Sequence, residues 1–165
     1  MGILRQRVRR AIRLVTRAFS LVELALVIAI IAILSAVAIP RFANSITLQS
    51  VDGAARRIAA DFELARGHAM TASVSQTVRL HGGSDPGYTL VSLQHPDHPL
   101  QPYTVSLAKD CNGAERVSYD FGGDLELVYD MYGVPDSAGQ FLIRVGAHYR
   151  TITVDVQTGR ASVSE

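Results

Sequence analysis

Three stretches in the second half of this sequence hold side chains that could do chemistry. His95, Asp97 and His98 in QHPDHPLQP supply ligand types that bind metals, but three flanking prolines favour an extended surface loop. GGSDPG, at residues 82–87, offers oxygens to calcium, yet its composition is more typical of a hairpin turn. Cys111 in KDCNG is the single cysteine, so we expect an exposed or half-buried turn residue with no disulfide and no redox motif.

Catalytic signatures are missing from the sequence. It contains no G-x-S-x-G, no H-E-x-x-H and no phosphate loop ending in Gly-Lys-Ser/Thr. We therefore expect no enzymatic activity, no cofactor and no bound metal.

A different kind of chemistry is suggested by Glu23, a carboxylate inside FSLVELALVIAIIAILSAVAI at residues 19–39. As a helix, these 21 residues span about 31 Å, close to the thickness of the hydrocarbon core of a bilayer. By the positive-inside rule, the basic segment before them stays in the cytoplasm and everything after Pro40 lies outside the inner membrane. The basic segment holds six arginines and no acid: Arg5, Arg7, Arg9, Arg10, Arg13 and Arg17.

Three interpretations of the apolar run remain open. In a plain signal anchor, Glu23 would lie near the headgroups, where a charge costs little. In a cleaved secretory signal peptide, cleavage would follow the A-x-A site of residues 36–38. In the third, residues 19–23, FSLVE, are a processing site that precedes a membrane helix.

The third interpretation rests on a resemblance. FSLVE followed by the apolar run resembles the processing segment of type IV pilins and type II secretion pseudopilins, in which glycine precedes Phe-Thr-Leu-Ile-Glu. The resemblance implies that prepilin peptidase cuts between Ala18 and Phe19 and methylates the new amino group of Phe19. It also makes Glu23 the fifth mature residue and Pro40 the twenty-second, where these helices often carry proline. Ala18 departs from the pattern, since the family usually has glycine there.

The position of Glu23 has a physical rationale under this interpretation. Cleavage would create an α-amine at Phe19 with a pKa of roughly 8, one helical turn from the Glu23 carboxylate. Within an assembly of packed helices, the carboxylate would neutralise that amine or a neighbour's and set the register between subunits.

After residue 39, helical periodicity continues and then gives way to alternation. Apolar residues recur at spacings of three or four up to about residue 72, and oppositely charged residues at similar spacing predict a solvated face. We expect a kink at Pro40. The predicted apolar stripe is Phe42, Ile46, Ala54, Ile58, Phe62, Ala65 and Ala69. The predicted charge pairs are Asp52–Arg56, Arg57–Asp61 and Glu63–Arg66.

Alternating segments follow, bounded by Gly, Pro, Asn and Asp, and predict a small antiparallel sheet. The expected fold class is α+β: a long N-terminal helix, membrane-spanning in its first half, packed on this sheet in a pilin-like ladle. We predict a leader at 1–18, the helix at 19–72 with its transmembrane half at 19–39, and a periplasmic β-rich domain at 73–165. The predicted strands are 76–80, 88–93, 103–107, 116–121, 125–129, 141–145, 151–156 and 161–164.

Two looser resemblances concern the function. DFELARGHAMTASVSQTVRL and the C-terminal segment are similar to the GspH/FimT group of minor pseudopilins and minor pilins, some of which bind DNA through Gly-Arg-x-Arg. Gly159 and Arg160 match that motif, but Ser162 replaces its second arginine, so we favour a hairpin turn. Without the six leader arginines, ten basic and 15 acidic residues leave a net charge of −5, which disfavours DNA binding.

The sequence therefore predicts a minor pseudopilin of a type II secretion system, with a single-pass helix in the bacterial inner membrane and a periplasmic C-terminal domain. Its expected partners are prepilin peptidase, other pseudopilins or pilins, the inner-membrane assembly platform and membrane lipid. A FimT-like minor type IV pilin in pilus assembly or DNA uptake, and a secreted or signal-anchored periplasmic β-domain protein, are the alternatives.

Overall fold

The computed structural model describes residues 19–164, which belong to two compact units. The first unit ends at Pro40 and the second begins at Arg41, so helix α1 (Leu21–Ala72) contributes to both. The predicted leader, with Ala18 and the six arginines, lies outside the described residues. Helix α1 continues through position 40, as the apolar pattern predicted. Continuity of the helix does not measure its bend, so the kink expected at this position stays a prediction.

The second unit buries one face of α1. Its buried residues recur at helical spacing, as the apolar pattern predicts. Phe42 and Ile46 were included in the predicted stripe, but they are 71% and 50% exposed because the strands do not cover them. The buried face consists of Val51, Ala54, Ala55, Ile58, Phe62, Ala65 and Ala69.

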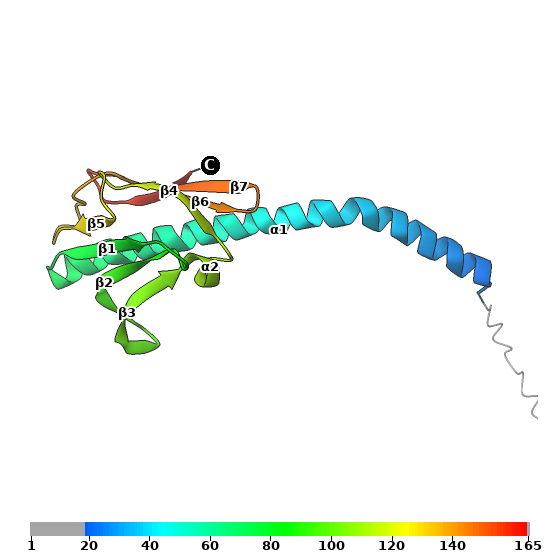
Figure 1. The fold of residues 1–165 in the computed structure, drawn as a ribbon, viewed down its shortest axis with the longest axis horizontal. Coiled ribbons are helices and arrows are strands. Elements are labelled where there is room, and N and C mark those ends of the chain that lie inside the picture. The colour runs from blue at the N-terminus through cyan, green and yellow to red at the C-terminus, as the bar shows by residue number, and fades with distance from the viewer. Residues whose placement is uncertain (1–18, 165) are drawn as a thin grey trace, which may run out of the picture. The chain divides into compact units, whose positions relative to one another are not determined.

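Eight strands form two antiparallel sheets of four (Figure 1), whereas the sequence predicted a single small sheet without this division. Sheet A has the order β3-β2-β1-β5 and sheet B the order β4-β6-β7-β8. Every predicted strand is present: the strand at 161–164 has the predicted bounds, and the others differ at one end or both. The strands are β1 (Gln76–His81), β2 (Gly87–His95), β3 (His98–Ser106), β4 (Glu115–Asp120), β5 (Glu126–Tyr129), β6 (Gly139–Val145), β7 (His148–Val154) and β8 (Ala161–Ser164).

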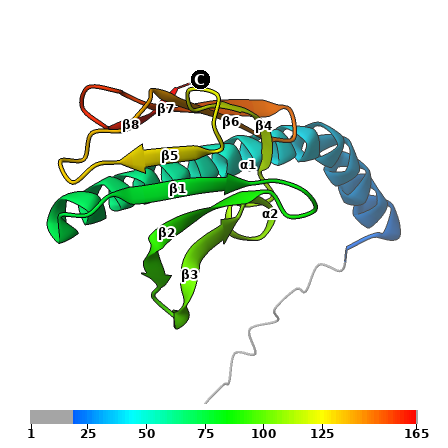
Figure 2. The ribbon, with the colours of Figure 1, turned by 60° about the vertical axis from the view of Figure 1, so that its left-hand side comes forward.

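Both sheets contribute to one core around the second half of α1 (Figure 2). The Phe62 ring lies 5.8 Å from the Tyr88 ring of sheet A, edge to face, and 6.4 Å from the Phe141 ring of sheet B. The Phe121 ring is 6.2 Å away. One aromatic side chain of α1 therefore contacts both sheets, and burying it stabilises the arrangement of all three elements.

Two local predictions were wrong. QHPDHPLQP is not an extended loop: it forms the end of the β2–β3 hairpin, in which His95 pairs with His98. Cys111 is not an exposed or half-buried turn residue, because it is 1% exposed at the C-terminal end of a short helix, α2 (Leu107–Asp110). Burial raises the pKa of its thiol to about 11, which makes it a packing residue rather than a reactive one.

Candidate functional site: the amino-terminal end of α1

Ser20 and Glu23 form the N-terminal end of α1. The Ser20 side-chain oxygen accepts a hydrogen bond from the Glu23 amide at 3.1 Å, and its carbonyl accepts one from the Leu24 amide at 3.1 Å. A serine cap with glutamate three residues later has the spacing of a capping box. The cap was not among the features predicted from the sequence, although S-L-V-E carries its pattern. Glu23 is thus exposed in the first helical turn, where the helix dipole favours a negative charge.

The apolar residues that follow are left uncovered. Every residue of 19–39 is exposed except Ser35, which is half-buried. Leu21 is 84% exposed and Ile33 is 69% exposed. A continuous apolar surface of this size marks an interaction with lipid or protein. By length and composition, the first part of α1 is able to cross a bilayer.

Small residues lie along one side of this apolar helix. Ala25, Ala29, Ala32 and Ala36 follow each other at spacings of four, three and four, so all four point in nearly the same direction. Small side chains at such spacing allow two helices to approach closely in a membrane. The segment therefore has large leucine and isoleucine side chains that suit contact with lipid. It also has a side of small alanine side chains that suits close packing with another helix.

In the second unit, a buried carboxylate joins α1 to the β2–β3 hairpin. Asp61 is 7% exposed, and its two oxygens accept hydrogen bonds from the hydroxyl groups of Tyr88, at 2.5 Å, and Tyr103, at 3.1 Å. Burial raises the pKa of Asp61, although both tyrosines and Arg57 act in the opposite direction. Arg57 also donates to the Asp110 carbonyl at 2.9 Å, which ties α1 to α2.

Two further acids on α1 bind sheet B. Asp52 accepts a hydrogen bond from the Arg150 side chain at 2.6 Å, and Glu63 accepts one from the Ala161 amide at 2.8 Å. Of the three predicted charge pairs, the structure contains Glu63–Arg66, at 3.5 Å. Asp52 and Asp61 bind groups of the sheets instead of forming a solvated face. Asp52, Asp61 and Glu63 of α1 therefore hold the strands against the helix.

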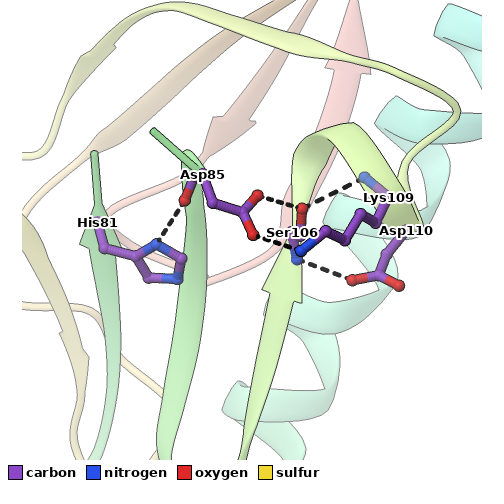
Figure 3. A network of polar contacts seen from close by, with 5 residues as sticks. All are labelled: His81, Asp85, Ser106, Lys109 and Asp110. Atoms are coloured by element: carbon purple, nitrogen blue, oxygen red, sulfur yellow. Dashed lines mark hydrogen bonds and ion pairs between the residues drawn. The ribbon is translucent and has the colours of Figure 1, made fainter. Parts of the chain in front are cut away.

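Figure 3 shows a polar network at the β1–β2 turn. Ser106 caps α2: its hydroxyl oxygen accepts from the Lys109 amide at 3.2 Å and donates to Asp85, while its own amide donates to Asp110 at 2.8 Å. Lys109 also pairs with Asp85 at 3.0 Å. His81 lies 3.2 Å from the Asp85 carbonyl. GGSDPG is therefore a hairpin turn, as predicted, and the carboxylate of its Asp85 binds α2.

The predicted metal-ligand residues at the end of the β2–β3 hairpin contact each other without converging. The His95 and His98 ring centroids lie 5.2 Å apart, and the His95 ring stacks on Tyr103 at 5.8 Å. His95 Nδ1 accepts a hydrogen bond from the Asp97 amide at 3.1 Å. Across the part of the chain that the structure describes, no group of three or more His, Cys, Asp or Glu side chains is placed to hold a metal.

Gly159 and Arg160 lie in the turn between β7 and β8, as the hairpin interpretation predicts. The Gly159 amide donates to the Asp155 carbonyl at 2.8 Å, and the Asp155 amide donates to the Arg160 carbonyl at 3.0 Å. Gly159 has φ +67°, and a Cβ there would lie 2.1 Å from the Gly133 carbonyl oxygen. A backbone packed this closely requires glycine, so Gly159 has a structural role.

No protein-family model matches this sequence, and no curated protein matches it. Among solved structures, the type IV minor pilin FimU of Pseudomonas aeruginosa (strain PAO1) is similar, with a TM-score of 0.51 and 15% identity over 71% of this chain and 90% of that chain. A second crystal form of FimU gives a TM-score of 0.45 and 14% identity, over 69% and 92% of the two chains. The first match confirms the expected fold, a long N-terminal helix packed on a small antiparallel sheet domain.

Proposed function

We propose that this chain is a minor subunit of a type IV pilin-like filament, and specifically a minor pseudopilin of a type II secretion system. It would be made as an inner-membrane precursor, cut between Ala18 and Phe19, and packed through the first part of α1 into a periplasmic filament. One observation carries the proposal. The uncovered apolar helix of residues 21–39, with Glu23 in its first turn, belongs to a chain that has the fold of a minor pilin.

The capped end of α1 supports a role for Glu23 in assembly. With Ser20 as the cap, α1 begins at Leu21, two residues after Phe19, so the amine created by cutting would lie beside the first turn that carries Glu23. An amine and a carboxylate brought into an apolar assembly are stabilised when they pair, because an unpaired charge there is costly. The alanine side of residues 25–36 would let neighbouring helices approach closely enough for such a pair to form.

The work of the protein would then be structural. Assembly of the filament requires partners that cut, extract and stack subunits: prepilin peptidase, the inner-membrane assembly platform and other pilin-like subunits. We propose no catalytic role for the chain itself.

The mature N-terminus tests the proposal directly. We expect mass spectrometry to find a methylated Phe19 in cells that contain prepilin peptidase, and an unprocessed chain in cells that lack it. A mature chain that begins at Ile39 would instead support a secretory signal peptide. A chain that keeps Met1 in both strains would support a plain signal anchor.

A substitution tests the role of Glu23. We expect Glu23→Ala to insert into the membrane normally but to be lost from sheared filaments, because the amine would have no partner during assembly. Glu115→Ala is the matched control, since Glu115 lies in β4 and pairs with Arg144 at the surface of the domain. Equal incorporation of both variants would contradict the pairing.

A minor type IV pilin is the second candidate, because FimU, whose fold this chain shares, is a type IV minor pilin. Deleting the gene separates the two: loss of exported protein from the medium indicates a secretion system, and loss of surface pili indicates a pilus. For a DNA-uptake role, the full chain in detergent would have to retard DNA at low salt, and Arg160→Ala would have to abolish the retardation.

A further inference from the structure

The β6–β7 hairpin rests on the first turns of α1 in the second unit (Figures 1 and 2). His148 Nε2 lies 2.9 Å from Asn44 Oδ1. At Gly146, a Cβ would lie 3.6 Å from the Thr47 methyl group, so the turn backbone packs directly on the helix. The end of this hairpin is therefore held beside residues 44–47.

The tether between this contact and the apolar run is short. Asn44 follows Ile39 by five residues. Five residues reach at most about 18 Å when fully extended, and about 8 Å as a helix, however the two units are arranged. The headgroup layer on each side of a bilayer is itself roughly 5–8 Å thick. With residues 21–39 in a membrane, the hairpin end stays within reach of its surface.

The side chains at this end suit a membrane interface. We define the juxtamembrane face as the exposed side chains around this end of the second unit: Arg41, Phe42 and Ile46 on α1, and Ala147 and Tyr149 on the hairpin. Phe42 is 71% exposed, Ile46 is 50% exposed and Tyr149 is 45% exposed. Aromatic and basic side chains of this kind are enriched where a protein meets lipid headgroups.

The charges around the face also favour lipid. Arg144 and Arg150 belong to the same hairpin and bind the carboxylates of Glu115 and Asp52. Arg41, at the same end of the unit, adds an exposed positive charge to the face. A positive charge near the surface is attracted to anionic lipids.

We propose that the juxtamembrane face binds the lipid headgroups of the bilayer in which its own α1 is embedded. The proposal rests on the membrane anchor of the proposed function. We favour a bilayer over a second copy of the chain as the partner. The five-residue tether holds the face close to lipid in every single chain, so the effective concentration of lipid is high before any assembly occurs.

The experiment uses the full chain in vesicles of phosphatidylethanolamine and phosphatidylglycerol. Tyr149→Cys is labelled with an environment-sensitive fluorophore, and a nitroxide quencher is attached to a lipid headgroup. Tyr132→Cys is the matched control: this tyrosine is 72% exposed, and the next residue, Gly133, packs on Arg66 and Met70 near the other end of α1. The native Cys111 does not compete for label, because its thiol is buried and its pKa is raised to about 11.

We expect loss of emission at position 149 and unchanged emission at position 132. Ala147→Cys repeats the measurement at a second exposed position of the turn, in case Tyr149→Cys folds poorly. Unquenched labels at 147 and 149, in chains that float with the vesicles, would overturn the lipid contact alone. Equal quenching at 132 and 149 would also overturn it. Chains that fail to float would overturn the membrane anchor, and this inference with it.

Discussion

Residues 21–39 and residues 51–69 of α1 are both apolar helix, but they differ in what covers them. In the first segment, Leu21 and Ile33 are 84% and 69% exposed, whereas Ile58 and Phe62 in the second are fully buried. The second segment supplies the core of its own domain, and the first leaves its apolar side chains uncovered. One helix therefore has a part that builds the core of the domain and a part whose apolar surface the described residues leave uncovered.

The two phenylalanines of α1 provide the sharpest test of this difference. We expect Phe62→Ala to lower the free energy of unfolding of the second unit by about 3–5 kcal/mol, because the ring contacts both sheets. Phe42→Ala should change it by less than about 0.5 kcal/mol. Urea denaturation of the full chain in detergent, followed by tyrosine fluorescence, measures both. Similar losses for the two variants would contradict the proposed division of α1.

Substitutions in the β7–β8 turn test the contacts that this turn makes with Gly133 and with Arg66, in the C-terminal part of α1. Gly159→Ala should cost about 1–3 kcal/mol, because alanine is strained at positive φ and its Cβ would collide with the Gly133 carbonyl. Arg160→Ala is the control and should change stability by less than about 0.5 kcal/mol, since Arg160 is exposed. The same denaturation experiment applies. A larger effect of Arg160→Ala would show that the arginine, rather than the glycine, stabilises this turn.

Ser20 and Ser106 cap helices in the first and second units, and replacing each of them compares the two units at a smaller expected change in stability. Ser106→Ala should destabilise the second unit by about 1 kcal/mol, because it removes the cap of α2 and a hydrogen bond to Asp85. Ser20→Ala should leave that stability unchanged and instead speed hydrogen exchange at the Glu23 amide, which Ser20 caps. A loss of domain stability in Ser20→Ala would mean that the two parts of α1 are energetically coupled.

The smallest expected effect is a pH dependence from Asp61. Because burial raises its pKa in the folded state, the folded chain holds the proton more tightly than the unfolded chain, and protonation stabilises the fold. This contribution is complete below the ordinary aspartate pKa of 3.8 and is lost as the pH rises through the raised value. The stability of the native chain relative to Asp61→Asn should therefore increase as the pH falls towards 4, as denaturation at several pH values would show. An unchanged difference would exclude this linkage.

Local patterns in the sequence predicted most of the secondary structure. The 3.6-residue period predicted α1, and alternation bounded by turn residues predicted all eight strands, because these signals depend on neighbours in the chain. The same reasoning identified the turn at Gly159 and the apolar run that contains Glu23. The cap formed by Ser20 was equally local and was available in the sequence as a capping box.

The sequence alone determined where the helix and strands lie, and it predicted that residues 19–39 would meet an apolar environment. Only the tertiary structure decided that the strands divide into two sheets, that Cys111 is buried, and that Asp61 binds two tyrosines instead of joining a solvated face. The physical reason is sequence distance. Tyr103 lies 42 positions from Asp61, and Arg150 lies 98 positions from Asp52, so no local period reports these partners.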